Sequence, residues 1–336
     1  MNPIKSKLLG FLAAMASNLP KGFVTLVIGS AAVSTAAIAD TFPTRPITLV
    51  VPSSAGAPSD VVARYLARSI GAQTNVGVIT ENKAGANGII GVQQVLRAPA
   101  DGYTVLFTTS SGMALNKFLF KSLPYDPQAD FIPIAVMARS FQLLAVNSHT
   151  PFKSVQEVIA YGKKEPGRLN YGYGTSVPQL SGSFFQQITG AKFTLVPYKS
   201  HVAMITALVG GEVDLSITDT ASLASYVKSG QVRVLATSSP KRLPGYPDTP
   251  TLKELGVPYE LVAWHGVFVR RGTPPEVVAR LTDLVKVATQ SPEFLEYLKT
   301  SGLDDFLLTG GDAAKYMDAD IKRWGQITHD AGVVPN

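Results

Sequence analysis

The sequence predicts an α/β protein that is built from two lobes. From residue 47 onward, short runs of β-branched residues alternate with segments of helical periodicity, which is the pattern of βαβ units on a parallel sheet. The pattern restarts near residue 141, and a chain of 336 residues has room for two domains of ordinary size. Because the C-terminal helices need a sheet to cover, we expect the chain to return to the first lobe. Two crossings between lobes imply a hinge.

The elements of the first lobe follow in order from these patterns. Strands are predicted over Ile47–Val51, Val76–Thr80 and Tyr103–Thr108, with a helix from Ser59 to Ile70 and another from about Gly88. Two extended runs nearly in line, 131–138 and 143–146, then lead into the second lobe.

The second lobe repeats the alternation. It is expected to hold helices over 154–164, 181–189, 202–209 and 220–228 and strands over 169–173, 193–196, 213–217 and 232–237. A strand over 261–269 leads back to helices over 274–289, 292–301 and 311–331. We therefore predict residues 40–140 plus 262–336 as the first lobe and residues 141–261 as the second.

Capping chemistry marks three helix starts. Each pairs an N-cap hydroxyl with an acid three residues later, in Ser154-x-x-Glu157, Thr251-x-x-Glu254 and Thr273-Pro-Pro-Glu276.

The first 39 residues have the composition of a signal peptide. They hold three lysines, no acid and two apolar runs before Ala37-Ile38-Ala39, and cleavage after Ala39 would remove half of the net charge of +6. An uncleaved membrane anchor is the alternative, although Pro20-Lys21-Gly22 interrupts the apolar span. The chain has no cysteine, so an exported protein would have neither a lipid anchor at cysteine nor a disulfide.

The sequence lacks the motifs of several classes of enzyme and binding protein. The four histidines, His149, His201, His265 and His329, have no zinc-site spacing, and there is no G-x-S-x-G or P-loop motif. Basic residues occur only in pairs, without the basic stripe and interleaved aromatics of a nucleic-acid interface. We therefore predict no catalytic residue, no metal, no cofactor and no nucleic-acid partner, and we expect His201 and His265 to be structural or surface groups.

Four small polar junctions lie where a strand ends and a helix begins. They are Pro52–Asp60, Thr108–Gly112, Gly172–Ser181 and Thr218–Ser222. Ligands of α/β sheets bind outside the carboxyl ends of the strands, and helix N-termini there attract anions. A single junction of this kind is explained by ordinary turn and capping chemistry. Four of them in two hinged lobes favour a cleft that closes on a small carboxylate.

The junctions supply most of the candidate ligand-binding residues. Asp60 is expected to stabilise a helix dipole instead, and Asp219 either caps the helix at 220 or meets the ammonium group of an amino-acid ligand. Tyr198 and Trp264 either line the cleft or belong to the core. The candidates are Ser54, Ala55, Gly56, Ser59, Thr109, Ser110, Gly174, Thr175, Ser176, Tyr198, Thr218 and Asp219.

Segments along nearly the whole chain resemble the Bug family, the solute receptors of tripartite tricarboxylate transporters. Among them are FPTRPITLVVPSSAGAPSD (42–60), ENKAGANGIIG (81–91), APADGYTVLFTTSSG (98–112) and WHGVFVRRGTPPEVVARL (264–281). Each segment is weak evidence, but their order and spacing from about Thr41 to Gly332 are specific. The resemblance implies a type II periplasmic binding protein fold, with mixed, mostly parallel sheets and an interlobe cleft.

The resemblance also implies a function. A protein of this kind is a monomeric, non-enzymatic receptor in the periplasm that holds a small mono-, di- or tricarboxylic acid for the permease subunits of the transporter. A ligand-presenting role beside a membrane sensor is the alternative, and an exported hydrolase is disfavoured because the sequence shows no nucleophile–base pair.

The resemblance transfers unevenly to single residues. The family's first loop falls on Pro52–Asp60, where Ser59 keeps a hydroxyl, and its second on Thr108–Ser111. The third segment is shorter here and lacks the family's histidine, and a common family aspartate falls on Thr218, one place before Asp219. The identity of the ligand therefore does not transfer.

Overall fold

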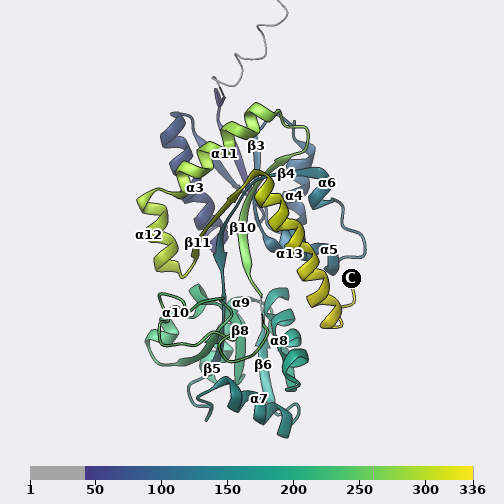
Figure 1. The fold of residues 1–336 in the computed structure, drawn as a ribbon, viewed down its shortest axis with the longest axis vertical. Helices are drawn as coiled ribbons and strands as arrows, with labels where there is room; N and C mark the ends of the chain where they lie inside the picture. Colours follow the sequence, from purple (N-terminus) through teal and green to yellow (C-terminus); the bar gives the residue numbers. More distant parts are fainter. Residues whose placement is uncertain (1–41, 260, 336) are drawn as a thin grey trace, which may run out of the picture. The chain divides into compact units, whose positions relative to one another are not determined.

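Two β-sheets organise the chain from Arg45 onward. The computed structural model describes residues 42–259 and 261–335, and the predicted signal peptide lies outside these residues. The chain divides into two units, the first ending at Thr44 and the second running from Arg45 to the C-terminus. Within the second unit, we call the sheet that begins with Ile47–Val51 and its helices lobe 1, and the other sheet with its helices lobe 2 (Figure 1).

Lobe 1 contains a six-stranded sheet in the order β11-β4-β10-β3-β1-β2. Its strands are β1 (Ile47–Val51), β2 (Val78–Asn82), β3 (Thr104–Thr109), β4 (Phe131–Ser140), β10 (Ala263–Arg270) and β11 (Asp304–Thr309). Its longer helices are α3 (Pro58–Thr74), α4 (Ile89–Arg97), α11 (Pro275–Thr289), α12 (Pro292–Ser301) and α13 (Gly310–Asp330). Shorter ones are η1 (Ala86–Gly88), the π-helix η2 (Ser111–Leu115), α5 (Asn116–Leu119) and α6 (Pro127–Asp130).

Lobe 2 contains a five-stranded sheet in the order β7-β6-β8-β5-β9. Its strands are β5 (Gln142–Asn147), β6 (Leu169–Tyr173), β7 (Phe193–Pro197), β8 (Leu215–Asp219) and β9 (Val232–Thr237). Its helices are α7 (Val155–Lys164), α8 (Ser176–Thr189), α9 (His201–Gly210) and α10 (Thr220–Lys228).

The two sheets share one topology. The order β2-β1-β3-β10-β4 in lobe 1 matches β7-β6-β8-β5-β9 in lobe 2, and the fourth strand of each arrives from the other lobe. The loop after β1 is therefore equivalent to the loop after β6, and the end of β3 is equivalent to the end of β8. The arrangement confirms the predicted two-lobe α/β fold with mixed sheets.

The crossing strands make the sheets less parallel than the βα alternation predicted. The pairings β1–β2, β1–β3, β6–β7 and β6–β8 are parallel, as successive βα units require. Strand β10 is antiparallel to both β3 and β4, and β5 is antiparallel to both β8 and β9. A strand that enters from the other lobe runs against its neighbours, and this reversal leaves no trace in local sequence.

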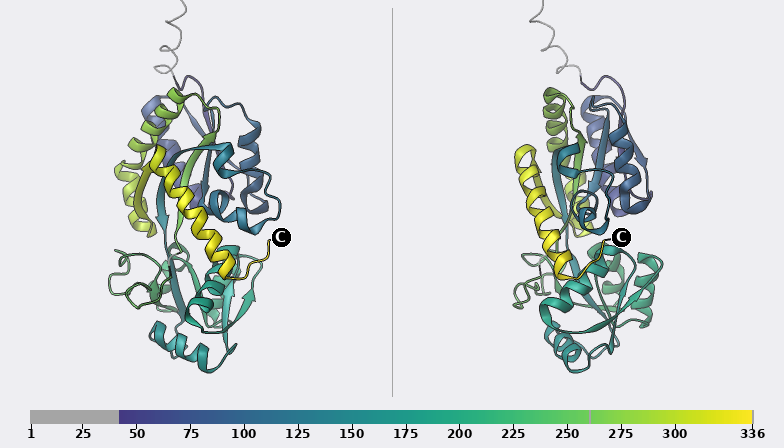
Figure 2. Two further views of the ribbon diagram at one scale, coloured as in Figure 1. Left: turned by 45° about the vertical axis from the view of Figure 1, so that its right-hand side comes forward. Right: turned by 90° about the vertical axis from the view of Figure 1, so that its right-hand side faces the viewer.

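Helix α13 contacts both lobes. It packs on β4 and on α8, and Figure 2 follows it from the lobe 1 sheet to the helices of lobe 2. At its middle, the buried carboxylate of Asp320 accepts hydrogen bonds from the indole N–H groups of Trp264 at 2.8 Å and Trp324 at 3.1 Å and from Arg323 at 3.0 Å. Trp264 is thus a core residue, which resolves its two predicted roles.

The predicted elements agree with the structure in type, with instructive exceptions at their ends. Helix α8 begins at Ser176 and not at residue 181, because Pro178 lies in its first turn, where no N–H donor is lost from the helix ladder. Strand β8 extends to Asp219, so two residues predicted in a loop belong to its end. The edge strand β11 was not predicted, because its pairing with β4 is purely tertiary.

One of the three predicted capping motifs begins a helix as expected. Ser154 accepts a hydrogen bond from the N–H of Glu157 at 3.2 Å at the start of α7. Thr251 and Glu254 form the reciprocal bonds, at 3.0 and 2.9 Å, but these close a turn. The prediction for Thr273 is wrong: its hydroxyl donates to the carbonyl of Arg270, and α11 begins without a side-chain cap.

Candidate functional site

The loop between β1 and α3 is held by a buried carboxylate. Asp60, 1% exposed, accepts hydrogen bonds from the N–H of Gly56 at 2.8 Å, from Arg64 at 2.9 Å and from Asn82 at 2.9 Å. Burial raises the pKa of Asp60, but these bonds and the charge of Arg64 outweigh it and leave the pKa below its ordinary value. The N–H of Gly56 is therefore engaged, and only other groups of this loop can meet an anion.

The other candidate residues of this loop differ in whether their polar groups are free to bond a ligand. The hydroxyl of Ser59 donates to Ser53 at 2.9 Å, so it shares its proton with a neighbour. Ser54 and Ala55 are exposed at the turn, where Gly56 has a φ of 80° and faces open space. Ser54 is thus the accessible hydroxyl of the loop.

At the end of β3, a buried hydroxyl has no partner. Ser110 is 1% exposed, and its Oγ makes no hydrogen bond within the described residues. Thr109 beside it is half-buried, and the π-helix η2 follows directly. Short π-helices are frequent at functional sites. The hydroxyl of Tyr125 donates a hydrogen bond to the carbonyl of Gly112 at 2.6 Å and so holds the start of η2 in place.

In lobe 2, the loop after β6 lies tightly against the start of α9. A Cβ on Gly174 would come within 2.2 Å of the carbonyl oxygen of Ser200 and 2.7 Å of the nitrogen of His201. Gly174 therefore allows two backbones to touch and has no side chain to offer a ligand. Thr175 is exposed at the N-cap of α8 without a side-chain capping bond.

Ser176 faces a cavity that residues of both lobes line. The cavity has a volume of about 450 Å³ and also touches Asn87 of η1 and Gln179 of α8. Asn87 has a φ of 53°, and its side-chain amide donates to the buried Asn116 at 2.9 Å. The predicted site did not include Asn87, although it lies in the glycine-rich segment ENKAGANGIIG (81–91) that contributes to the family resemblance.

The end of β8 mirrors the end of β3. Thr218 is 0% exposed, and no group in the described part of the chain bonds to its Oγ1. Asp219 is the N-cap of α10, where it accepts from the N–H of Ser222 at 2.9 Å. It also lies 3.0 Å from Nε2 of His201. The structure therefore supports the capping role of Asp219 and brings in His201, which the sequence analysis had taken for a structural or surface group.

The charge of Asp219 is stabilised in this position. Burial raises its pKa, but the hydrogen bond and charge of His201, together with the bonds from Ser222, bring the pKa below its ordinary value.

Tyr198 is directed elsewhere. Its hydroxyl lies 3.4 Å from Glu212, which precedes the first residue of β8, and its ring packs with the hydrophobic cluster of lobe 2. The hydroxyl group of Tyr198 therefore points toward the amino ends of the parallel strands, away from the predicted site.

Strand register places the two unpartnered hydroxyls, of Ser110 and Thr218, near the segment where the chain crosses from β4 of lobe 1 to β5 of lobe 2. Thr109 is level with His265, which is level with Met137 of β4, and Thr218 is level with Leu143 of β5. Met137 and Leu143 are six steps apart along the chain, which is at most about 20 Å even when fully extended, so the two strand ends lie within reach of one ligand-binding region.

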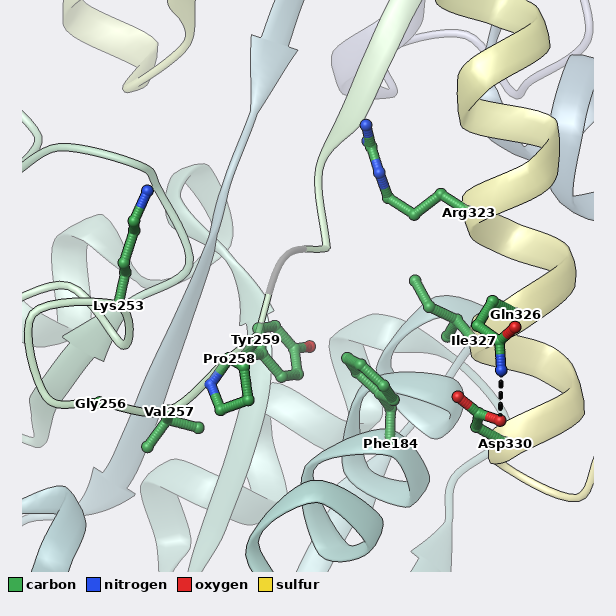
Figure 3. A pocket seen from close by; sticks show the side chains of 10 residues that line it. All are labelled: Phe184, Lys253, Gly256, Val257, Pro258, Tyr259, Arg323, Gln326, Ile327 and Asp330. Atoms are coloured by element: carbon green, nitrogen blue, oxygen red, sulfur yellow. Dashed lines mark hydrogen bonds between the residues drawn. The ribbon is translucent and has the colours of Figure 1, made fainter.

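A second cavity, of about 570 Å³, lies between α8, α13 and residues 253–259 (Figure 3). Its floor is apolar, with Phe184 and Ile327, and none of the predicted site residues lines it. Its acidic group, Asp330, is bonded to Gln326 at 2.6 Å, and Arg323 is bonded to Asp320. Among the described residues, the buried side-chain atoms without a partner lie at the ends of β3 and β8 and not in this cavity.

Residues 42–259 and 261–335 contain no cluster of three or more side chains suited to hold a metal ion. In the same residues, no helix has both the length and the hydropathy to cross a bilayer.

Comparison with known proteins places this arrangement in a family. The family model described as "Tripartite tricarboxylate transporter family receptor" matches residues 62–333. Protein BugT of Bordetella pertussis is 31% identical over 314 residues, which cover 92% of this chain and 96% of that protein.

Solved structures agree with this assignment. Rpa4515 of Rhodopseudomonas palustris with adipate matches with a TM-score of 0.77 and 34% identity, over 88% of this chain and 100% of that one. MatC of the same organism, with bound malate, matches with a TM-score of 0.72 and 28% identity, over 85% and 99% of the two chains. The chain therefore belongs to the receptor family of the tripartite tricarboxylate transporters, the family that its sequence resembles.

Proposed function

We propose that this protein captures a small carboxylate between its lobes, in the periplasm, for a tripartite tricarboxylate transporter. The observation that carries the proposal is the pair of buried, unpartnered hydroxyls, Ser110 and Thr218, at equivalent strand ends in the two lobes. A buried hydroxyl without a partner costs free energy, and an anionic oxygen would satisfy it. Two related proteins hold adipate and malate, which favours a dicarboxylate.

The proposed site combines these hydroxyls with Ser54, Thr109, Thr175 and Ser176 at the same edges of the sheets. The proposal also includes lobe boundaries at 140/141 and 261/262, beside the strands that cross between the lobes. We further propose that residues 1–39 are removed on export, that the protein acts as a monomer, and that it docks to the permease subunits.

The proposal is one of binding without turnover. Ser222 Oγ lies 2.8 Å from Nε2 of His201, a pair that resembles a nucleophile and its base. In a catalytic triad the carboxylate holds the other ring nitrogen, which leaves Nε2 free to accept the serine proton. Here Asp219 lies 3.0 Å from the same Nε2, so that nitrogen keeps its own proton. The hydroxyl of Ser222 also donates to Asp219, which opposes a nucleophilic role for this serine.

Calorimetry tests the function directly. Protein refolded free of ligand is titrated with adipate and with L-malate, and we expect one equivalent of at least one acid to bind per chain. Mass spectrometry of the released acid should show it unchanged. Absence of binding by both acids, or recovery of an altered acid, would contradict the proposal.

Removing the two unpartnered hydroxyls should weaken binding without weakening the fold. For Ser110→Ala and Thr218→Val we expect losses of about 0.5–1.5 kcal/mol each in binding free energy, or up to ~3 kcal/mol if the acceptor is a carboxylate. Their stability to urea should not fall, because no hydrogen bond of the protein is lost.

Ser216 on the same strand is the matched control. Its buried hydroxyl donates to the carbonyl of Gly172 at 2.9 Å. Ser216→Ala should therefore lower the free energy of unfolding. If Thr218→Val loses stability as Ser216→Ala does and still binds the acid at full affinity, Thr218 does not contact the ligand.

A further inference from the structure

Three side chains from different elements of lobe 2 form one polar cluster at the carboxyl ends of its strands. His201 begins α9, Asp219 ends β8, and Ser222 lies in the first turn of α10. Nε2 of His201 lies 3.0 Å from Asp219 and 2.8 Å from Ser222. The side chains of His201 and Asp219 remain 26% and 36% exposed, so solvent or a ligand can reach them. The unpartnered Thr218 is the chain neighbour of Asp219.

The geometry assigns the protons of His201. Because a carboxylate accepts at Nε2, that nitrogen carries a hydrogen in either charge state of the ring. Nδ1 has no hydrogen-bond partner in the residues that the structure describes, so it is the nitrogen that gains or loses a proton. In the neutral ring Nδ1 presents a lone pair, which repels a carboxylate. In the protonated ring it presents an N–H donor and a positive charge.

Charged and neutral groups from several elements face the ring of His201. Asp219 from β8 lies on the Nε2 side of the ring, and its negative charge opposes the positive end of the helix dipole at the start of α9. Tyr246, from the segment after β9, also lies near Asp219: burial, and then this carboxylate, raise its pKa, so it stays neutral. The loop after β6 meets the backbone at the start of α9 through Gly174, and Lys199, two residues before His201, is exposed.

We propose that His201 determines affinity for anionic ligands at the lobe 2 edge, donating from protonated Nδ1 to one carboxylate, so that binding strengthens as pH falls. Asp219 acts through His201 as a positioning residue that holds the ring and its charge. The inference rests on the proposed carboxylate site. It also settles how an acid can approach an edge that bears a carboxylate: the imidazolium neutralises Asp219 and leaves a donor for the ligand.

The test measures affinity for adipate and for L-malate by calorimetry between about pH 6 and about pH 8, where carboxylates of both acids are ionised. For the wild type we expect about a tenfold gain in affinity toward the acidic end, the size of a charge-assisted hydrogen bond. His201→Asn should remove this pH dependence. His149→Asn, at an exposed histidine that follows the far end of β5, should keep it.

NMR titration of the histidine ring supplies a readout that a purely structural role would not change. Adding the bound acid should shift the ring Nδ1 signal of His201, because this nitrogen then donates a hydrogen bond to a carboxylate. Asp219→Asn should shift the pH midpoint of binding downward, since the imidazolium loses its counter-charge.

The outcomes separate this inference from the proposed function. Failure of both acids to bind at any pH would overturn the carboxylate site and this inference with it. Binding that is equally strong across the pH range, or a pH dependence that survives in His201→Asn, would overturn the role of His201 alone.

Discussion

Replacing Gly174 with alanine should both destabilise lobe 2 and abolish ligand binding. The new Cβ would lie 2.2 Å from the carbonyl oxygen of Ser200 and 2.7 Å from the nitrogen of His201. Both are backbone atoms, so no rotamer change can relieve the overlap. Either the β6–α8 loop or the start of α9 has to move, and overpacking of this kind costs about 1–3 kcal/mol or more.

The loss of binding follows from the same displacement. The loop after β6 carries Thr175 and Ser176, and the start of α9 carries His201, so a shift of either separates groups that the proposed site needs together. Urea denaturation and calorimetry with adipate and L-malate measure the two effects.

Gly210→Ala is the matched control for this substitution. Gly210 is the last residue of α9, and a Cβ there would meet no atom within 4 Å. This variant should fold and bind as the wild type does. Wild-type stability and affinity in Gly174→Ala would show that the two backbones are not in contact.

The stability of the protein should fall as pH decreases from about 6.5 to about 4, in a step that belongs to His265. This ring is buried in lobe 1, stacks on Phe107 and donates from Nδ1 to the carbonyl of Ala138 at 3.2 Å. Ala138 lies within β4 with a φ of 48°, where a non-glycine residue is strained, so the imidazole also supports an unfavourable backbone conformation.

The direction of the effect follows from the protons bound in each state. Burial lowers the pKa of His265 to about 4 in the folded protein, only partly offset by the Ala138 carbonyl, whereas the unfolded chain has the ordinary value of about 6.5. Between these values the unfolded state binds more protons. The free energy of unfolding should therefore drop with falling pH, by about 3 kcal/mol over the whole window.

His265→Phe isolates this contribution. The variant keeps an aromatic ring beside Phe107 and has no group to titrate, so its unfolding free energy should depend less on pH in this range. His329→Asn, at an exposed histidine, should retain the slope of the wild type. A wild-type slope in His265→Phe would assign the acid sensitivity to other groups.

Local patterns in the sequence were sufficient to predict most of the elements. The strands β1, β6 and β9 and the helices α10 and α12 have the predicted bounds, because apolar periodicity and turn residues act over a few positions. The two-lobe fold follows from the restart of the βα pattern, and Ser110 and Thr218 were found by their place at strand ends.

The tertiary structure decided which groups are available to a ligand. Asp60 and Gly56 satisfy each other across a turn, Tyr198 turns to Glu212, and Gly174 serves a backbone contact, although all but Asp60 were candidates on equal terms with Ser110. Such pairings depend on which atoms meet in space. The sequence places polar groups at an edge but does not say which are already bonded.

What the sequence by itself determined is the class of fold, the family and the edges of the sheets where a ligand can bind. Only the tertiary structure decided that β5 and β10 run antiparallel to both of their neighbours, and that His201, Asp219 and Ser222 meet from three elements. The reason is physical: hydrophobic periodicity and capping are local properties of the chain, whereas strand direction and hydrogen-bond partners are set by contacts between residues far apart in sequence.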